Sequence, residues 1–164
     1  MERIIVIVKA IKSRLCIAGM VLAILTAVTG MTACSDDEGE TTLINTSWKL
    51  QGYGNTNDQT IREPLESPMY GSRAYTVRFS ESGTISGLAC FNENMGRYRV
   101  WGDSIKVLSF GGTKVGSVSP YLEEEDYYKF SFMNCSTFEI SNRQLKLFYN
   151  DGKEYMLFNR WSGS

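Results

Sequence analysis

The sequence predicts an α+β domain, mostly β with one helix, that follows an N-terminal targeting segment. An apolar run at Leu15–Val28 gives way to an abruptly acidic stretch, Ser35–Glu40. From Asn45 onward, short runs of alternating apolar residues are separated by turn residues, which is typical of antiparallel strands. One segment near residues 121–134 has helical spacing instead. The 164 residues therefore hold one modest domain plus extras.

The N-terminal segment is typical of a signal peptide. Leu15–Val28 is almost wholly apolar but shorter than the roughly 20 residues that a membrane-spanning helix needs. A signal peptide also requires a basic flank before the apolar run and small residues after it, and both are present. The basic residues are Arg3, Lys9, Lys12 and Arg14.

The end of this segment resembles the lipobox of bacterial lipoproteins. Met31-Thr32-Ala33-Cys34 places two small residues before a cysteine, with Met31 where leucine is usual. The resemblance implies that residues 1–33 are removed and that Cys34 becomes a lipidated mature N-terminus. An ordinary signal peptide cut near Ala33, or a short uncleaved anchor, is the alternative.

Residues 34–44 are predicted to form an acidic, flexible tether between the lipid and the folded residues 45–164. Ser35-Asp36-Asp37-Glu38 resembles the export signal of surface lipoproteins in some Gram-negative lineages, although a solvated linker explains the acids equally. We therefore expect a lipid-anchored outer-membrane protein, on the periplasmic face or at the cell surface.

Charge and composition exclude several classes of function. Residues 1–33 contain four of the 17 basic and one of the 18 acidic residues, so the mature chain has a net charge of −4. This balance argues against nucleic acid as a partner and against electrostatic binding to anionic lipid. The chain has no histidine, which excludes Ser-His-Asp and Cys-His catalysis and His-ligated zinc. We expect no enzymatic activity, no cofactor and no metal.

About eight mainly antiparallel strands are predicted, forming a strongly bent sheet or partial barrel. In the first strand Trp48 and Leu50 share a face with Gly52, and a polar loop, Asn55–Ser72, follows it. The strands lie within residues 47–54, 74–79, 84–88, 96–101, 104–110, 137–140, 145–149 and 154–160. Further residues predicted to face inward are Tyr75, Val77, Phe79, Tyr98, Val100, Ile105, Val107 and Ser109.

One helix is predicted at about Tyr121–Asn134. Ser119 is suited to the N-cap and Pro120 to the first helical position. The acids Glu123–Asp126 then fall in the first turns, where the helix dipole favours them, and are interpreted as solvated rather than as a calcium site. The helix is predicted to pack one face on the sheet, with Glu125 interrupting that face. Its other members are Tyr121, Tyr128, Phe132 and Cys135.

The folded part, from about Leu43 to Arg160, resembles the META/HslJ family of envelope domains. The motifs are "NTSWKL" at Asn45–Leu50, "YTVRFSESGTISG" at Tyr75–Gly87, Asn92 and Gly96 of "FNENMGRY", Thr113, and the closing "QLKLFYNDGKEYMLF". The resemblance implies an envelope role linked to stress tolerance. The family often has a cysteine directly before its asparagine, where this chain has Phe91, and another after its threonine, near the place where this chain has Ser117. The family disulfide is therefore not carried over to this chain.

The remaining cysteines and aromatic residues are the other candidate site residues. In an oxidising envelope Cys90 and Cys135 could form a disulfide, although the helical spacing also fits Cys135 as a buried thiol. Tyr53, Tyr70 and Trp101 lie near turns or loops and are candidates for an exposed aromatic patch. "SFGGTKVG" at Ser109–Gly116 lacks the residue order of a phosphate loop.

The sequence favours a lipid-anchored binding or scaffolding domain whose partner is an envelope protein or a small ligand. One alternative is a lipocalin-like carrier with an apolar cavity between helix and sheet. The other is a protease inhibitor or protein-interaction module that presents the loop Asn55–Ser72. An enclosed cavity of a few hundred Å³ would favour the carrier, and an ordered loop beside exposed apolar side chains would favour the module.

Overall fold

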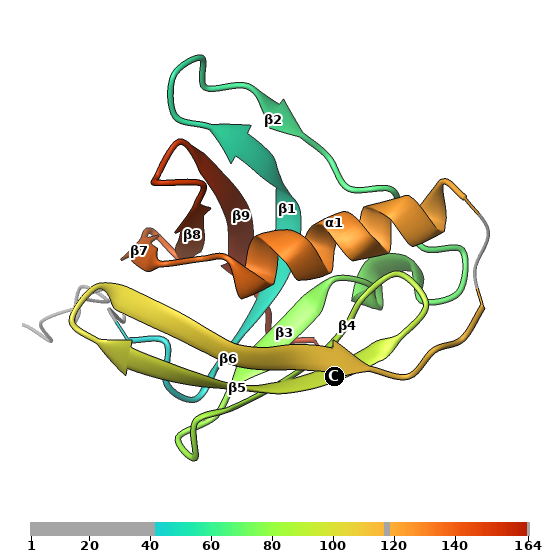
Figure 1. The fold of residues 1–164 in the computed structure, drawn as a ribbon, viewed down its shortest axis with the longest axis horizontal. Helices are drawn as coiled ribbons and strands as arrows, with labels where there is room; N and C mark the ends of the chain where they lie inside the picture. Colours follow the sequence, from blue (N-terminus) through green and yellow to red (C-terminus); the bar gives the residue numbers. More distant parts are fainter. Residues whose placement is uncertain (1–41, 117–118, 164) are drawn as a thin grey trace, which may run out of the picture. The chain divides into compact units, whose positions relative to one another are not determined.

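Nine strands and one α-helix make up the part of the chain described by this computed structural model, residues 42–116 and 119–163 (Figure 1). The strands are β1 (Thr46–Asn55), β2 (Ile61–Arg62), β3 (Thr76–Phe79), β4 (Thr84–Leu88), β5 (Glu93–Trp101), β6 (Ser104–Gly112), β7 (Thr137–Ser141), β8 (Gln144–Tyr149) and β9 (Glu154–Arg160). Helix α1 spans Tyr121–Met133, and a 3-10 turn, η1, spans Gly71–Arg73. The predicted signal peptide, Cys34 and the acids after it lie outside the described residues. Within those residues, no helix is both long and apolar enough to cross a membrane.

Eight of the strands in the described residues form an antiparallel ring. They follow the order β1-β3-β4-β5-β6-β7-β8-β9, and β9 pairs back with β1. The short strand β2 pairs with the end of β1, at Tyr53 and Gly54. The predicted strongly bent, mainly antiparallel sheet with one helix is confirmed. The loop Asn55–Ser72 differs from the prediction because it contains β2 and the first two residues of η1.

The ring closes unevenly. Strands β1 and β9 pair along most of their length, from Trp48 opposite Arg160 to Asn55 opposite Glu154. Strands β6 and β7 are in register only at Ser104 and Thr137. Helix α1 lies in the connection between β6 and β7, and Figure 1 shows it passing over β6 toward the β1–β9 pair. The helix therefore covers the ring where its strand pairing is weakest.

Aromatic side chains fill the space between the ring and the helix. Phe132 of α1 lies between Phe79 of β3 and Phe110 of β6, with ring centroids 6.1 and 4.5 Å apart. Trp48 of β1 and Tyr128 of α1 are also buried. This core supplies the main hydrophobic stabilisation of the fold. The first turns of α1 are positioned in addition by hydrogen bonds and ion pairs of their polar side chains.

Two local predictions are wrong by one residue. Ser109 is exposed because the register of β5 and β6 shifts beside Tyr98, so that Phe110 packs on the core instead. At the helix start, Pro120 rather than Ser119 holds the cap position, and its carbonyl accepts a hydrogen bond from the Glu124 amide at 3.1 Å. The Ser119 hydroxyl instead bonds the carboxylate of Glu123.

Candidate functional site

Two consecutive glutamates in the first turns of α1 are buried. Glu124 is 6 % exposed and Glu125 is 1 % exposed, whereas Glu123 and Asp126 face solvent. The interpretation of this acidic run as wholly solvated is therefore wrong. Buried carboxylates need partners, because removing a charge from water costs several kcal/mol, on the order of 5, unless it is paired and hydrogen-bonded. Each glutamate finds its partners on a different side of the helix.

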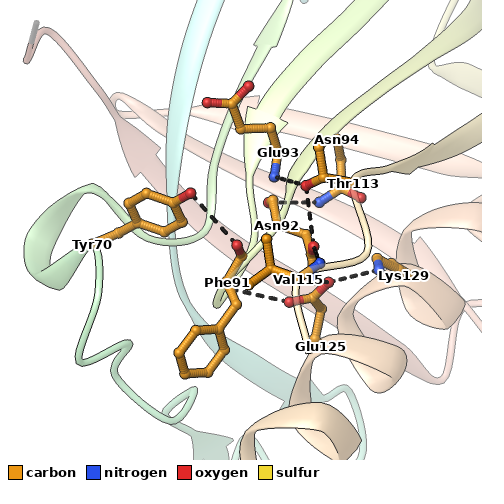
Figure 2. Close-up of polar contacts among 9 residues, drawn as sticks. All are labelled: Tyr70, Phe91, Asn92, Glu93, Asn94, Thr113, Val115, Glu125 and Lys129. Atoms are coloured by element: carbon orange, nitrogen blue, oxygen red, sulfur yellow. Dashed lines mark hydrogen bonds and ion pairs between the residues drawn. The ribbon is translucent and has the colours of Figure 1, made fainter. Parts of the chain in front are cut away.

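Glu125 points to the loop between β4 and β5 (Figure 2). Its Oε1 accepts hydrogen bonds from Asn92 Nδ2 at 2.7 Å and from Lys129 Nζ at 2.6 Å, one turn further along the helix. Its Oε2 accepts one from the Phe91 amide at 3.1 Å. The carboxylate is thus held by two side chains and one backbone group, which fixes the rotation of α1 relative to this loop.

Asn92 extends these contacts to the segment after β6. Its Oδ1 accepts hydrogen bonds from Thr113 Oγ1 at 3.1 Å and from the Val115 amide at 2.6 Å. Thr113 Oγ1 also accepts one from the Glu93 amide at 3.2 Å. Three segments far apart in the sequence therefore meet at one 4 % exposed asparagine. We call this set the Asn92 network: Asn92, Thr113, Val115, Glu125 and Lys129.

Glu124 points the other way, to strand β2. Arg62 donates to its two carboxylate oxygens at 2.7 and 3.3 Å. The same guanidinium lies over the rings of Tyr53 and Tyr127, with its carbon 4.5 and 5.1 Å from their centroids. We call these four residues the Arg62 clamp. Because Arg62 is half exposed, the clamp joins a buried helix face to the loop at the surface.

The buried groups beside these glutamates are held protonated. The hydroxyls of Tyr53 and Tyr128 are buried without a hydrogen-bond partner among the described residues. Burial raises the pKa of Tyr53, Tyr75 and Tyr128. The neighbouring Cys90 adds next to the rise in the pKa of Tyr75, and the charge of Glu124 adds to the rise at Tyr53 and Tyr75. Burial likewise raises the pKa of the Cys90 thiol. Groups in this state do not act as nucleophiles or bases near neutral pH.

The predicted aromatic patch does not form. Tyr53 is only 5 % exposed because Arg62 and the edge-on ring of Tyr127, 4.8 Å away between centroids, cover it. Tyr70 is half buried and its hydroxyl faces the Phe91 carbonyl at 3.5 Å. Trp101 is 59 % exposed at the end of β5. The prediction is therefore wrong for Tyr53, and the other two residues lie on separate elements.

Cys90 and Cys135 are both free, buried thiols, so the disulfide that the sequence left open is absent between them in the structure. The Cys135 thiol donates to the Phe132 carbonyl at 3.0 Å, and burial raises its pKa to about 12. Cys90 lies beside the Tyr75 hydroxyl. Cys135 therefore has the role of a buried core residue that helical spacing predicts.

The clefts at the surface are open. The largest described one, about 410 Å³, lies beside the end of α1 and is lined by Phe130, Tyr149, Asp151 and Glu154 among others. A smaller one of about 230 Å³ adjoins the Arg62 clamp. Another, of about 240 Å³, lies on the outer face of β3 and β4. The described clefts are thus surface features and not an apolar chamber inside the ring.

Comparisons with known proteins identify a family and a shared fold. Residues 40–161 match the family described as META domain. The chain belongs to the META domain family. This META domain is similar to a protein from Burkholderia xenovorans solved by NMR, with 24 % identity and a TM-score of 0.58 over 74 % of this chain and 85 % of that one. It is also similar to a DUF4847 family protein from Bacteroides vulgatus, with 11 % identity and a TM-score of 0.56 over 73 % of this chain and 95 % of that one. These two likenesses show a shared fold, and no curated protein matches the chain.

Some of the residues in the candidate site were predicted from motifs in the sequence, and others are recognised only in the structure of this META domain. Asn92 and Thr113, which the sequence analysis named from the family resemblance, are hydrogen-bonded partners. Glu125 was visible as a charged interruption of an apolar helix face, and the network explains that interruption. Arg62 was missed because a lone arginine in a polar loop carries no periodic or motif signal.

Proposed function

We propose that this META domain is a lipid-anchored binding or scaffolding module of the cell envelope that contacts a partner protein through the loop Asn55–Ser72. The observation that carries the proposal is that this loop is ordered and exposes apolar side chains. Ile61, Leu65 and Met69 are 48 %, 38 % and 57 % exposed. Apolar side chains presented together on an ordered loop are typical of a protein-interaction surface.

The loop is held at two points, which supports a preorganised interface. Within β2, Arg62 is fixed to Glu124 of α1. Near its end, the buried Ser67 hydroxyl donates to the Cys90 carbonyl and accepts hydrogen bonds from the Met69 and Tyr70 amides, both at 3.1 Å. A loop that is already ordered loses less conformational entropy on binding, so more of the contact energy appears as affinity.

The proposal is tested by cross-linking in intact cells of the source organism. A photoreactive residue at Leu65 or Met69 is expected to give a discrete higher-mass adduct, and one at Glu139, an exposed position on β7, to give none. Arg62→Met, which releases the clamp but keeps the exposed apolar residues of the loop, is expected to weaken the adduct. Equal cross-linking from all three positions, or none from the loop, contradicts the proposal.

Anchoring by lipid is tested separately. If Cys34 carries acyl chains, Cys34→Ala moves the protein from the membrane fraction to the soluble fraction and removes the acyl mass from the mature form. Cys90→Ala is the matched control, because it removes a thiol from the folded core and leaves the anchor. Membrane retention of the Cys34→Ala variant contradicts anchoring while leaving the loop proposal open to its own test.

A lipocalin-like carrier is less well supported, because aromatic side chains occupy the ring interior. No enzymatic activity is proposed, since the described groups with strongly raised pKa values are tyrosines and a thiol held protonated by burial. If the partner protein is a protease, the interaction module is a protease inhibitor. Identification of the cross-linked partner by mass spectrometry tests this alternative.

A further inference from the structure

The outer face of β3 and β4 carries a basic pocket on a protein whose mature chain is acidic. The pocket has a volume of about 240 Å³, and Arg73, Arg78 and Trp161 contribute to its lining. Neither aspartate nor glutamate is among the residues that line it. Neither arginine forms a salt bridge with another of the described residues. The two guanidinium groups are therefore available to an anion from outside.

Strand register places hydroxyl groups around these cations. Arg78 of β3 lies opposite Ser47 of β1 on one side and Ser86 of β4 on the other, and all three side chains belong to the outer face. The backbone amide of Trp161 donates to the Ser47 carbonyl at 2.8 Å, which holds the indole beside this row. The pocket thus combines two arginines, short hydroxyl side chains and one aromatic ring.

We propose that this pocket binds an acidic sugar, as one unit of an anionic oligosaccharide. A guanidinium presents planar paired donors that match a carboxylate or sulfate group. Hydroxyl side chains such as Ser47 and Ser86 donate to and accept from sugar hydroxyls. The indole of Trp161 offers a flat amphipathic surface for the apolar face of a sugar ring. The charge of the pocket is complementary to an anionic ligand and opposite to that of the chain as a whole.

The basic character continues across the neighbouring strands, which favours an oligosaccharide over a single sugar. Arg97 and Arg99 of β5 are exposed on the same outer face, two residues apart. Arg99 lies directly opposite Lys106 of β6, a like-charged cross-strand pair that destabilises the sheet. Glu93 lies on this face opposite Leu88, beside the pocket, and Asp103 lies in the turn between β5 and β6. Strands β5 and β6 carry no acid between Arg97, Arg99 and Lys106. A polyanion lying across the row would offset the repulsion.

The site is separate from the loop Asn55–Ser72: Arg73 directly follows the loop, and the other lining residues lie on β1, β3 and β4 or after β9. Its test is calorimetric titration of the full-length chain in detergent with a heparin-derived hexasaccharide, and with neutral cellohexaose as the control ligand. We expect binding only to the sulfated sugar, with affinity that falls as salt rises. Arg78→Gln and Trp161→Ala are each expected to weaken it at least tenfold. Lys153→Gln is the matched control, since it removes one exposed cation at the opposite end of β9 and is expected to leave affinity unchanged.

The length of the saccharide tests whether the exposed cations of β5 and β6 contribute to binding. Arg99→Gln is expected to weaken the hexasaccharide and to leave a heparin-derived disaccharide unaffected. Unchanged thermal midpoints are expected for the arginine variants, because both side chains are exposed. Three results overturn the proposal: no binding of the hexasaccharide at low salt, equal loss in Lys153→Gln and Arg78→Gln, or binding of phosphatidylglycerol vesicles without binding of the sugar.

Discussion

Helix α1 is held at two neighbouring residues in opposite ways. Glu125 lies in the Asn92 network, where amides, a hydroxyl and an ammonium group from three segments are joined by hydrogen bonds around a buried carboxylate. Glu124 lies in the Arg62 clamp, where a half-exposed guanidinium on a two-residue strand is its partner. The difference teaches that adjacent acids in one helical turn can serve separate purposes. The network joins parts of the fold to each other, and the clamp joins the fold to its surface loop.

The largest effect is expected from breaking the network at its centre. Glu125→Ala should lower the free energy of unfolding by about 3–5 kcal/mol, because it leaves Lys129 and the Asn92 amide without their carboxylate. Chemical denaturation of the full-length chain measures this. Asp126→Ala, which removes the adjacent exposed acid, is the control and should change stability by less than about 0.5 kcal/mol. A loss below about 1 kcal/mol for Glu125→Ala would show that the Asn92 network contributes no more to the free energy of unfolding than the Arg62 clamp does.

A smaller loss is expected at the asparagine. Asn92→Ala should cost about 2–3 kcal/mol, because the Glu125 carboxylate and the Val115 amide each lose a partner. Thr113→Ala should cost about 1 kcal/mol, and the double variant less than the sum, because the two side chains share one hydrogen bond. Strict additivity in this cycle would show that the network is a set of separate contacts.

The clamp should matter little for global stability and much for the loop. Arg62→Met keeps the apolar stem and removes the charge, so the loss should stay below about 1 kcal/mol for a half-exposed ion pair. Hydrogen exchange of the amides of β2 and its neighbours should rise in the variant, because the loop loses its tie to α1. High salt should reduce the effect of Arg62→Met and leave that of Glu125→Ala. Equal salt sensitivity at both sites would remove the distinction drawn between them.

Much of the fold could be predicted from the sequence because strand patterns are local. Trp48 and Leu50 of β1, and Val77 and Phe79 of β3, recur at every second position, and turn residues mark the hairpins. Eight strands and the helix were therefore predicted at nearly their observed bounds. Ser109 was placed wrongly because a bulge reverses the alternation without leaving a mark in composition. Strand β2 was missed because two exposed residues carry no periodicity.

The candidate site was predicted only in part, since its contacts join residues distant in the chain. Asn92 and Thr113 came from a family resemblance, and Glu125 from an interruption of a helical face. The partnership of Arg62 with Glu124 spans 62 residues and depends on how the ring closes. Tyr53 was expected to be exposed because it lies near a turn. Arg62, its partner across the β1–β2 pair, and Tyr127 of the distant helix α1 cover it instead.

The smallest effect near neutral pH is expected at Tyr53, whose hydroxyl is buried in the clamp without a hydrogen-bond partner among the described residues. Tyr53→Phe should leave stability at pH 8 unchanged or raise it by up to about 1 kcal/mol, because an unpaired polar group is removed. Burial, and next the Glu124 charge, raise the pKa of Tyr53 above its ordinary value of 10, so the folded state holds this proton more tightly than the unfolded chain. The stability that depends on this proton is complete below pH 10 and is lost as pH rises further. Above pH 10, the free energy of unfolding from chemical denaturation should therefore fall more steeply with pH in the native chain than in the phenylalanine variant, by up to about 1.4 kcal/mol per pH unit. Parallel profiles would mean that the Tyr53 hydroxyl finds a partner in solution and that the clamp is more open to water than its geometry indicates.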